Sequence, residues 1–274
     1  MTATLLRVHR AAAAVWAALI LALTVWEVWL NQVTADDTRA AQTHCTQDYC
    51  DVFSSPYADW TGVVALVTGY AFLAVAAFAG GALIGRELES GTARLAWTQG
   101  ITPTRWLAAK LALPALALTL GLGAVVAVFH WGWAVNRDLM WDDWYAQAFY
   151  LAGGPTAVAY ALCALAVGTL TALLLRRTLP ALGASVAVMW LLGLVLETYR
   201  ADLWPRRTRT SAKPVELPEH VWEVASGRNA GGYYAVFHPE SHYWPLQLVE
   251  CGIVLALAGA AVAVSFTVLR RRAA

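Results

Sequence analysis

Charged residues are scarce in this chain, and common motifs of soluble enzymes are missing. Only 14% of the 274 residues are charged and 59% are hydrophobic, whereas ordinary soluble domains carry about 25% charged residues. A soluble globular fold is therefore disfavoured. Neither the phosphate-binding pattern Gly-x-x-x-x-Gly-Lys-Ser/Thr nor the zinc-protease pattern His-Glu-x-x-His occurs. We therefore expect no enzyme activity, bound cofactor or metal in this chain.

Long apolar runs occupy most of the sequence. Runs of about 20 apolar residues are read as membrane-spanning helices, because only helices and closed barrels satisfy all backbone hydrogen bonds in lipid. The candidate spans lie approximately at 11–30, 61–84, 107–129, 155–175, 179–196 and 245–269. No small-x-small cleavage site follows Leu30, so we expect the first run to remain as a helix. The sequence thus predicts an all-α polytopic protein with a single transmembrane domain over residues 1–274.

The placement of Lys and Arg orients these spans, since cytosolic loops are enriched in both residues. With the N-terminus inside, the inner segments hold Arg7, Arg10, Arg86, Arg94, Arg105, Lys110, Arg176, Arg177, Arg270, Arg271 and Arg272. The first two outer loops are rich in Asp instead. We therefore expect a protein of the plasma membrane with both of its termini in the cytosol. The net charge of +1 hides the asymmetry and gives no sign of a nucleic-acid partner.

Three outer loops are expected, at 31–60, 130–154 and 197–244. In the third, the run LPEHVWEV predicts a helix that begins at Pro218, within a small extracellular cap. Cys45 and Cys50 share the first loop, where a disulfide is favoured over a metal site. Several tryptophans fall near the outer ends of spans, as in the aromatic belts of membrane proteins. A substrate-binding aromatic cage is the alternative for them.

The inner segment 85–105 is short, polar and basic, between two long apolar runs. Gly91 and Gly100 bracket a short helix capped by Thr92, and Thr102 with Pro103 starts the next span. Such a helix either rests on lipid headgroups or receives force from a cytosolic partner.

Three stretches resemble actinobacterial permeases of the type-2 ABC exporter class. They are RELESGTARLAWTQGITPTRWLAAKL at 86–111, GTLTALLLRRTLPAL at 168–182 and FHPESHYWPLQLVECG at 237–252. Together they cover roughly a third of the chain, at matching topological positions. The long outer loops depart from the family pattern, so the cargo does not follow from the resemblance.

The resemblance implies a permease dimer, homo- or heteromeric, driven by a separate cytosolic ATPase that binds ATP and Mg. In that arrangement the ATPase contacts the inner segment as a coupling helix. The implied coupling residues are Arg86, Glu87, Glu89, Gly91, Arg94, Leu95 and Trp97. The expected cargo is an amphipathic drug, a peptide or a lipid, moved outward across a bacterial membrane.

Two acids, Glu27 and Glu250, interrupt the apolar runs. Intramembrane charges are costly and often functional, so both are candidates for the translocation path. Glu250 lies near the N-terminus of its helix, where the helix dipole also favours an anion. Glu27 lies near a helix C-terminus, where the dipole opposes it, and it requires a partner, a proton or water.

Three other classes of function compete with the ABC permease. An ion-coupled secondary transporter is disfavoured because the spans carry no charge at their centres. An intramembrane enzyme lacks a nucleophile–base pair. A non-transporting immunity or sensor subunit shares the ATPase partner and is not separable by sequence.

Overall fold

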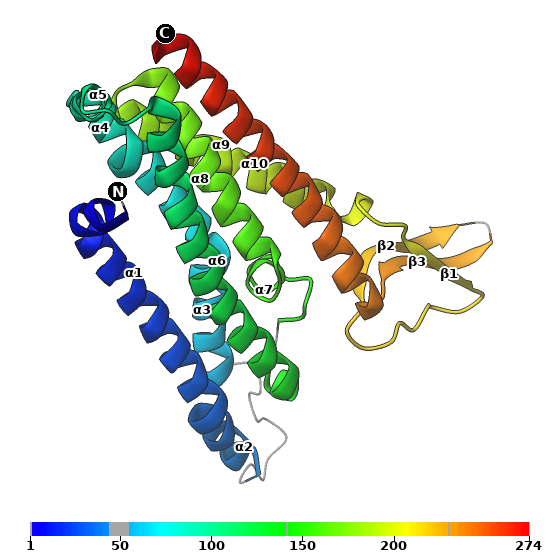
Figure 1. Cartoon of the computed structure of the whole chain (residues 1–274). Coiled ribbons are helices and arrows are strands. Elements are labelled where there is room, and N and C mark those ends of the chain that lie inside the picture. The colour runs from blue at the N-terminus through cyan, green and yellow to red at the C-terminus, as the bar shows by residue number, and fades with distance from the viewer. Residues whose placement is uncertain (1, 44–54, 141, 230, 274) are drawn as a thin grey trace.

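The computed structural model describes residues 2–43, 55–140, 142–229 and 231–273 (Figure 1). Among these residues, 6 helices are long and apolar enough to cross a membrane. The prediction of an all-α bundle of six spans is confirmed. The predicted disulfide cysteines, Cys45 and Cys50, lie outside the described residues.

Each predicted span corresponds to a helix or a run of joined helices. The first run comprises α1 (Thr2–Trp29), the π-helical turn η1 (Leu30–Thr34) and α2 (Ala35–Thr43). The second comprises α3 (Pro56–Phe78), the π-helical turn η3 (Ala79–Gly85) and α4 (Arg86–Glu89). The others are α6 (Pro103–Val135), α8 (Thr156–Leu175), α9 (Thr178–Tyr199) and α10 (Tyr243–Ala273).

Side-chain caps set the starts of two of these helices. Ser55 Oγ accepts a hydrogen bond from the backbone N–H of Ala58 (3.1 Å), and Pro56 follows at the first turn of α3. Thr102 Oγ1 accepts from the N–H of Arg105 (3.4 Å), with Pro103 at the first turn of α6. The predicted start of the third span at Thr102-Pro103 is therefore confirmed, because the sequence supplies both the cap and the residue that suits the first turn.

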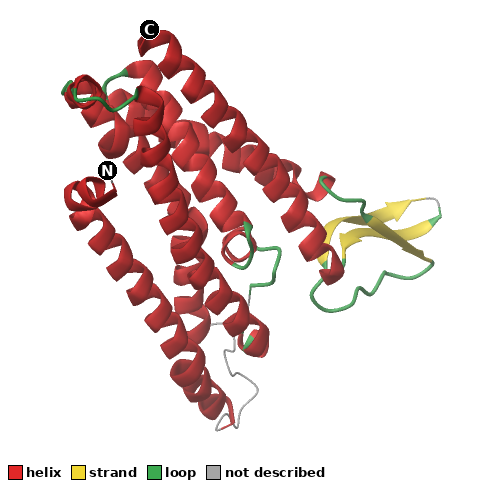
Figure 2. Ribbon diagram, viewed as in Figure 1, coloured by secondary structure: helices red, strands yellow, loops and turns green. Residues whose placement is uncertain are grey.

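The third loop folds into a sheet, not a helix. The strands β1 (Arg207–Ser211), β2 (Trp222–Asn229) and β3 (Gly232–His238) form an antiparallel sheet in the order β1-β3-β2. The helix predicted from Pro218 is wrong, because Trp222 onward pairs with β3, and residues 214–218 adopt no regular secondary structure. The sheet projects sideways from the bundle (Figure 2).

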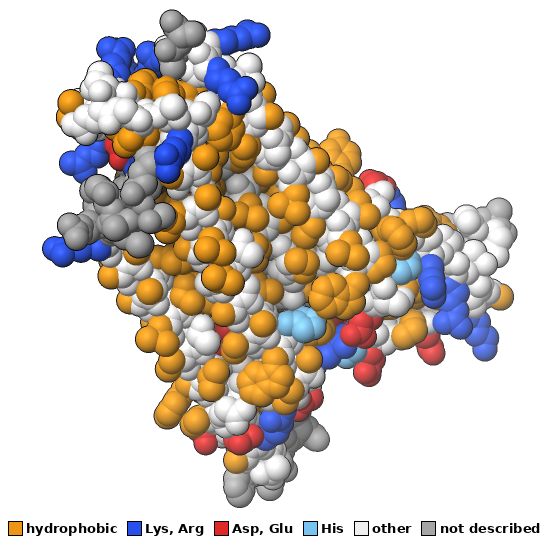
Figure 3. Space-filling model, in the orientation of Figure 1, with side chains coloured by type: hydrophobic (Ala, Val, Ile, Leu, Met, Phe, Trp, Pro, Cys, Tyr) orange, Lys and Arg blue, Asp and Glu red, His pale blue; other side chains and the backbone are white. Residues whose placement is uncertain are grey.

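Both chain termini and the segment α4–α5 lie at one end of the bundle, here called the terminal end (Figure 1). The sheet and α2 lie toward the opposite end. Figure 3 shows mostly hydrophobic side chains over the middle of the face in view, with Lys and Arg at the terminal end and a mixture of acidic and basic side chains on the sheet and toward the opposite end. An apolar belt between two charged ends matches the environment of a membrane.

The core of the bundle forms around α8, the most enclosed span, whereas α1 is the least enclosed. α8 packs against α3, η3, α9 and α10. A Cβ at Gly168 of α8 would lie 2.7 Å from Ala79 Cβ and 2.8 Å from the backbone nitrogen of Gly80. Helix crossings this close require glycine, and Gly80 and Gly81 of η3 lie similarly close to Ala181, Leu182 and Ser185 of α9.

Candidate functional site

The segment at the terminal end is built from two short helices. After α4, Gly91 adopts a left-handed conformation (φ 76°) and turns the chain into α5 (Thr92–Thr98). Gly100, with φ 87°, turns it again before Thr102 begins α6. Thr92 is the first residue of α5 and Gly91 its N-cap, so the predicted cap is displaced by one residue. Both turns need glycine because other residues rarely adopt a positive φ.

Glu87 joins this segment to α6. Its Oε1 lies 2.5 Å from Lys110 Nζ, and its Oε2 accepts a hydrogen bond from Trp106 Nε1 (3.3 Å). The Lys110 side chain is only 2% exposed. Removing one partner of a buried ion pair is strongly destabilising. The main role of Glu87 is therefore to hold the segment in place against α6.

Glu89 joins the same segment to a second part of the bundle. Its Oε2 accepts a hydrogen bond from the backbone N–H of Thr178 (2.8 Å), the first residue of α9. Arg176, in a left-handed conformation (φ 53°), ends α8 immediately before this point. The two carboxylates of α4 therefore attach it to α6 and to the α8–α9 junction.

α5 presents both a packed face and a free face. Trp97 meets Trp106 edge-on, with ring centroids 5.8 Å apart. Leu95 is 60% exposed, and Arg86 and Arg94 are exposed as well. Among the predicted coupling residues, Arg86, Arg94 and Leu95 thus face outward, whereas Glu87, Glu89 and Trp97 make contacts within the chain.

Glu250 belongs to a buried ion pair away from that segment. Arg200 of η5 (Arg200–Asp202) donates from Nε to Oε2 (2.8 Å) and from Nη2 to Oε1 (3.2 Å), and Tyr160 donates to Oε1 (2.8 Å). Arg200 also donates to Gln147 of α7 (Gln147–Ala152) and lies 3.9 Å over the ring of Tyr150. Glu250 is fully compensated here and joins α8, η5 and α10.

Glu27 is in the opposite situation. It is 2% exposed, and neither carboxylate oxygen has a hydrogen-bond partner among the described residues. Of the two predicted translocation-path acids, only Glu27 therefore has no hydrogen-bond partner in the part of the chain that the structure describes. The two acids are not brought together, since Glu27 lies in α1 and Glu250 in α10.

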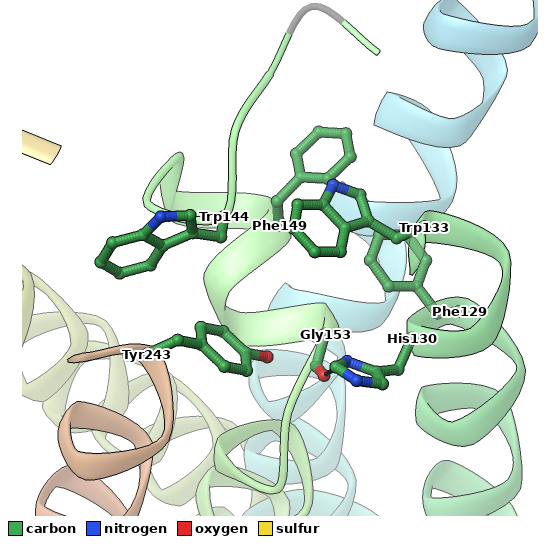
Figure 4. A pocket seen from close by; sticks show the side chains of 7 residues that line it. All are labelled: Phe129, His130, Trp133, Trp144, Phe149, Gly153 and Tyr243. Atoms are coloured by element: carbon green, nitrogen blue, oxygen red, sulfur yellow. Dashed lines mark hydrogen bonds between the residues drawn. The ribbon is translucent and has the colours of Figure 1, made fainter. Parts of the chain in front are cut away.

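An aromatic pocket lies near the end of the bundle opposite the termini, between α6, α7 and α10 (Figure 4). Its lining residues are Phe129, His130, Trp133, Trp144, Phe149, Gly153 and Tyr243. His130 Nδ1 donates to the carbonyl of Gly153 (3.0 Å), which fixes the ring. Trp133, near the end of α6, and Tyr243, at the start of α10, are thus part of a packed aromatic cluster.

The joint between the sheet and the bundle holds two histidines. His238 ends β3, its Nε2 donates to the carbonyl of Ala201 (3.0 Å), and its Nδ1 lies 2.9 Å from Nδ1 of His242. Burial lowers the pKa of His238 below its usual 6.5, and the charge of Arg206 adds to this effect, whereas the Ala201 hydrogen bond opposes it. Two facing Nδ1 atoms share one proton, so this contact is lost when both rings are charged.

Stability is therefore expected to fall as the pH drops below about 6.5. There the unfolded chain binds more protons than the folded one, because His238 is harder to protonate when folded. The midpoint of thermal unfolding at pH 7.5 and 5.5 measures this slope. His238→Gln should flatten it, and an unchanged slope in that variant would contradict the assignment.

Sequence reasoning missed the internal partners of these acids. Lys110 was assigned only as an inner positive charge, although a lone Lys near the end of a span signals a nearby acid. Arg200 follows the fifth span directly, at the same end as Glu250, but the sequence does not show that the fifth and sixth spans bring these two side chains together. Thr178 acts through its backbone, which no sequence pattern marks.

Six apolar helices with a short, firmly attached helical segment at one end define this protein as a multi-pass membrane protein. The family model described as ABC-2 membrane transporter related matches residues 11–200, and the chain belongs to that family. Permeases of this class work in general with a separate ATP-binding-cassette subunit and are typically not catalytic themselves. No curated protein and no solved structure matches the chain.

Proposed function

We propose that this chain is the membrane-spanning subunit of an ATP-driven exporter, and that a separate cytosolic ATPase docks on residues 86–106. One observation carries the proposal: α4 is fixed to α6 and to α9, whereas Leu95 of α5 stays 60% exposed. A surface helix that only rested on lipid headgroups would have no need of two such attachments.

The attachments let the segment act as a lever. A displacement of α5 reaches α6 through Glu87 and Lys110, and reaches α9 through Glu89 and Thr178. ATP and Mg would be bound by the partner, and its closure would push on α5. The permease spans would then change their relative positions, as in other transporters that move as rigid bodies.

The proposed ATPase-docking surface contains fewer residues than the sequence predicted. We assign Leu95 as the apolar anchor, with Arg94 and Arg86 as its charged surroundings, since these three side chains are exposed. Trp97 holds α5 against α6 through its contact with Trp106. A few anchors of this kind usually supply most of the binding energy of an interface.

The remaining parts of the proposal follow from charge and resemblance. The basic terminal end lies in the cytosol, the sheet lies outside, and a second permease copy completes the transporter. The cargo is an amphipathic drug, a peptide or a lipid, moved outward. Dissipation of the proton gradient then leaves export intact while ATP is present, which separates this function from ion-coupled transport.

Replacement of Leu95 by Asp tests the docking surface. An aspartate in an apolar anchor position should reduce ATPase co-purification and export about tenfold or more. The chain is tagged and purified from its own host, and the bound phosphate-loop protein is quantified.

Ala41→Asp is the matched control, because it adds the same charge at an exposed position of α2, at the other end of the bundle. Unfolding temperatures of both variants should equal that of the natural chain. Normal ATPase recovery and export in Leu95→Asp would overturn the proposed docking site.

A further inference from the structure

Glu27 carries a buried carboxyl group for which the described residues provide no counter-charge. Asn31, one turn further along, donates from Nδ2 to the backbone carbonyl of Glu27 (2.8 Å) and not to its carboxylate. The guanidinium of Arg39 binds Asn136 Oδ1 (2.9 Å) and Asp138 Oδ1 (3.0 Å). Asn31 and Arg39 are thus both engaged with groups other than the Glu27 carboxyl group.

A hydroxyl lies at the same depth on the facing helix. Tyr57 of α3 donates to Oδ1 of Asn31 (2.7 Å), which lies in the turn η1 that continues α1, and this bond sets the register of the two antiparallel segments. One turn deeper on each helix stand Glu27 and Thr61. Thr61 Oγ1 is also buried without a hydrogen-bond partner among the described residues. Two buried polar side chains, Glu27 and Thr61, therefore stand one turn beyond the Tyr57–Asn31 hydrogen bond on the two helices.

An aromatic pair flanks this polar spot. Trp26 and Trp60, the residues directly before Glu27 and Thr61, have ring centroids 5.5 Å apart. Trp60 is 49% exposed, on the surface that faces lipid in a membrane. An apolar body resting on these rings would place its polar head toward Glu27, and indole rings also attract cations.

We propose that Glu27 and Thr61 bind the cationic head of an amphipathic ligand, whose apolar body packs on Trp26 and Trp60. The inference rests on the proposed export function, and it names the cargo class as lipophilic cations. A buried charge needs a partner of opposite sign, and a ligand that brings one into a low-dielectric site is bound strongly. Neutral or anionic amphiphiles gain nothing from this carboxylate.

The ligand reaches Glu27 when α1 moves away from α3. α1 is the least enclosed span, and the wide turn η1 (Leu30–Thr34) follows Glu27 directly. Such π-helical turns are frequent at functional sites, where they let a helix bend. Opening α1 would expose the carboxylate to the bilayer, from which an amphipathic cation arrives.

The test compares two ions of equal shape and opposite charge, tetraphenylphosphonium and tetraphenylborate. Each is titrated onto the purified chain in lipid nanodiscs at pH 7, without ATPase or ATP. The natural chain should bind the phosphonium and not the borate. Glu27→Gln should weaken phosphonium binding at least tenfold, whereas Glu27→Asp should retain part of it.

Glu197→Gln is the control, since Glu197 is an exposed acid of α9; it should bind as the natural chain does. Glu27→Gln should also unfold at no lower temperature, because its carboxylate has no partner to lose. Equal phosphonium binding by Glu27→Gln, or no binding by the natural chain, overturns the inference. Phosphonium binding is measured without the ATPase. Its outcome therefore does not depend on whether the Leu95→Asp experiment supports the proposed docking site.

Discussion

Replacement of Glu250 by Gln is expected to lower the free energy of unfolding by about 3–5 kcal/mol, the cost of breaking a buried ion pair. The Arg200 side chain is 3% exposed and that of Glu250 0%. Without the carboxylate, Arg200 keeps its charge in a site where Gln147 and the ring of Tyr150 are its other partners. The glutamine side chain keeps only one acceptor oxygen for two donors, Tyr160 and Arg200, and its amide nitrogen then faces one of them.

Thermal unfolding in detergent, followed by size-exclusion chromatography, measures this loss. Glu197→Gln removes an exposed acid and should unfold at the temperature of the natural chain. The double variant Arg200→Met, Glu250→Leu should recover most of the loss, since apolar residues of similar volume often replace a buried pair without penalty. A Glu250→Gln protein as stable as the natural chain would show that the pair contributes nothing.

The contrast between Glu250 and Glu27 shows which properties of a buried acid can be predicted from the sequence. Both are single acids in apolar runs, and the sequence alone gives them the same candidate role. The structure pairs Glu250 with Arg200, which is 50 positions away in the chain and follows a different span. Long-range pairs of this kind depend on how helices pack, so local patterns do not reveal them. The lining role of Glu27 stays a prediction.

The spans were predictable for the opposite reason. An apolar run of about 20 residues is a local property, and lipid demands that it be helical. The start of α6 was equally local, since Thr102 and Pro103 adjoin it. The sheet was missed although Thr208 and Thr210 alternate with Arg207 and Arg209, a period of two that favours a strand.

For the acids of the inner segment, the sequence predicted the location, and the structure adds their partners. The sequence placed Glu87 and Glu89 in a short polar segment, and their chemistry suggested contacts with a partner protein. The structure directs them to Lys110 and Thr178 of the same chain. Their predicted contact with an ATPase is untested, but an attached α4 makes α5 a better lever than a free loop.

Gly168→Val is expected to destabilise the protein by about 3 kcal/mol, the upper end of the usual cost of overpacking a core. The first carbon of the new side chain already meets Ala79 Cβ at 2.7 Å, the nitrogen of Gly80 at 2.8 Å and the carbonyl of Ala76 at 2.9 Å. Two of these atoms belong to the backbone, so no side-chain rotation relieves the overlap. α8 has to move away from α3 and η3.

Gly123→Val is the matched control, because a Cβ at Gly123 meets nothing within 4 Å. It should unfold at the natural temperature, whereas Gly168→Val should unfold well below it. Gly168→Val should also lose ATPase co-purification. η3 continues directly into α4, so a displaced η3 would shift the proposed docking segment, residues 86–106, as well. If Gly168→Val lost stability but kept normal ATPase recovery, the docking segment would hold its position through Glu87 and Glu89 alone.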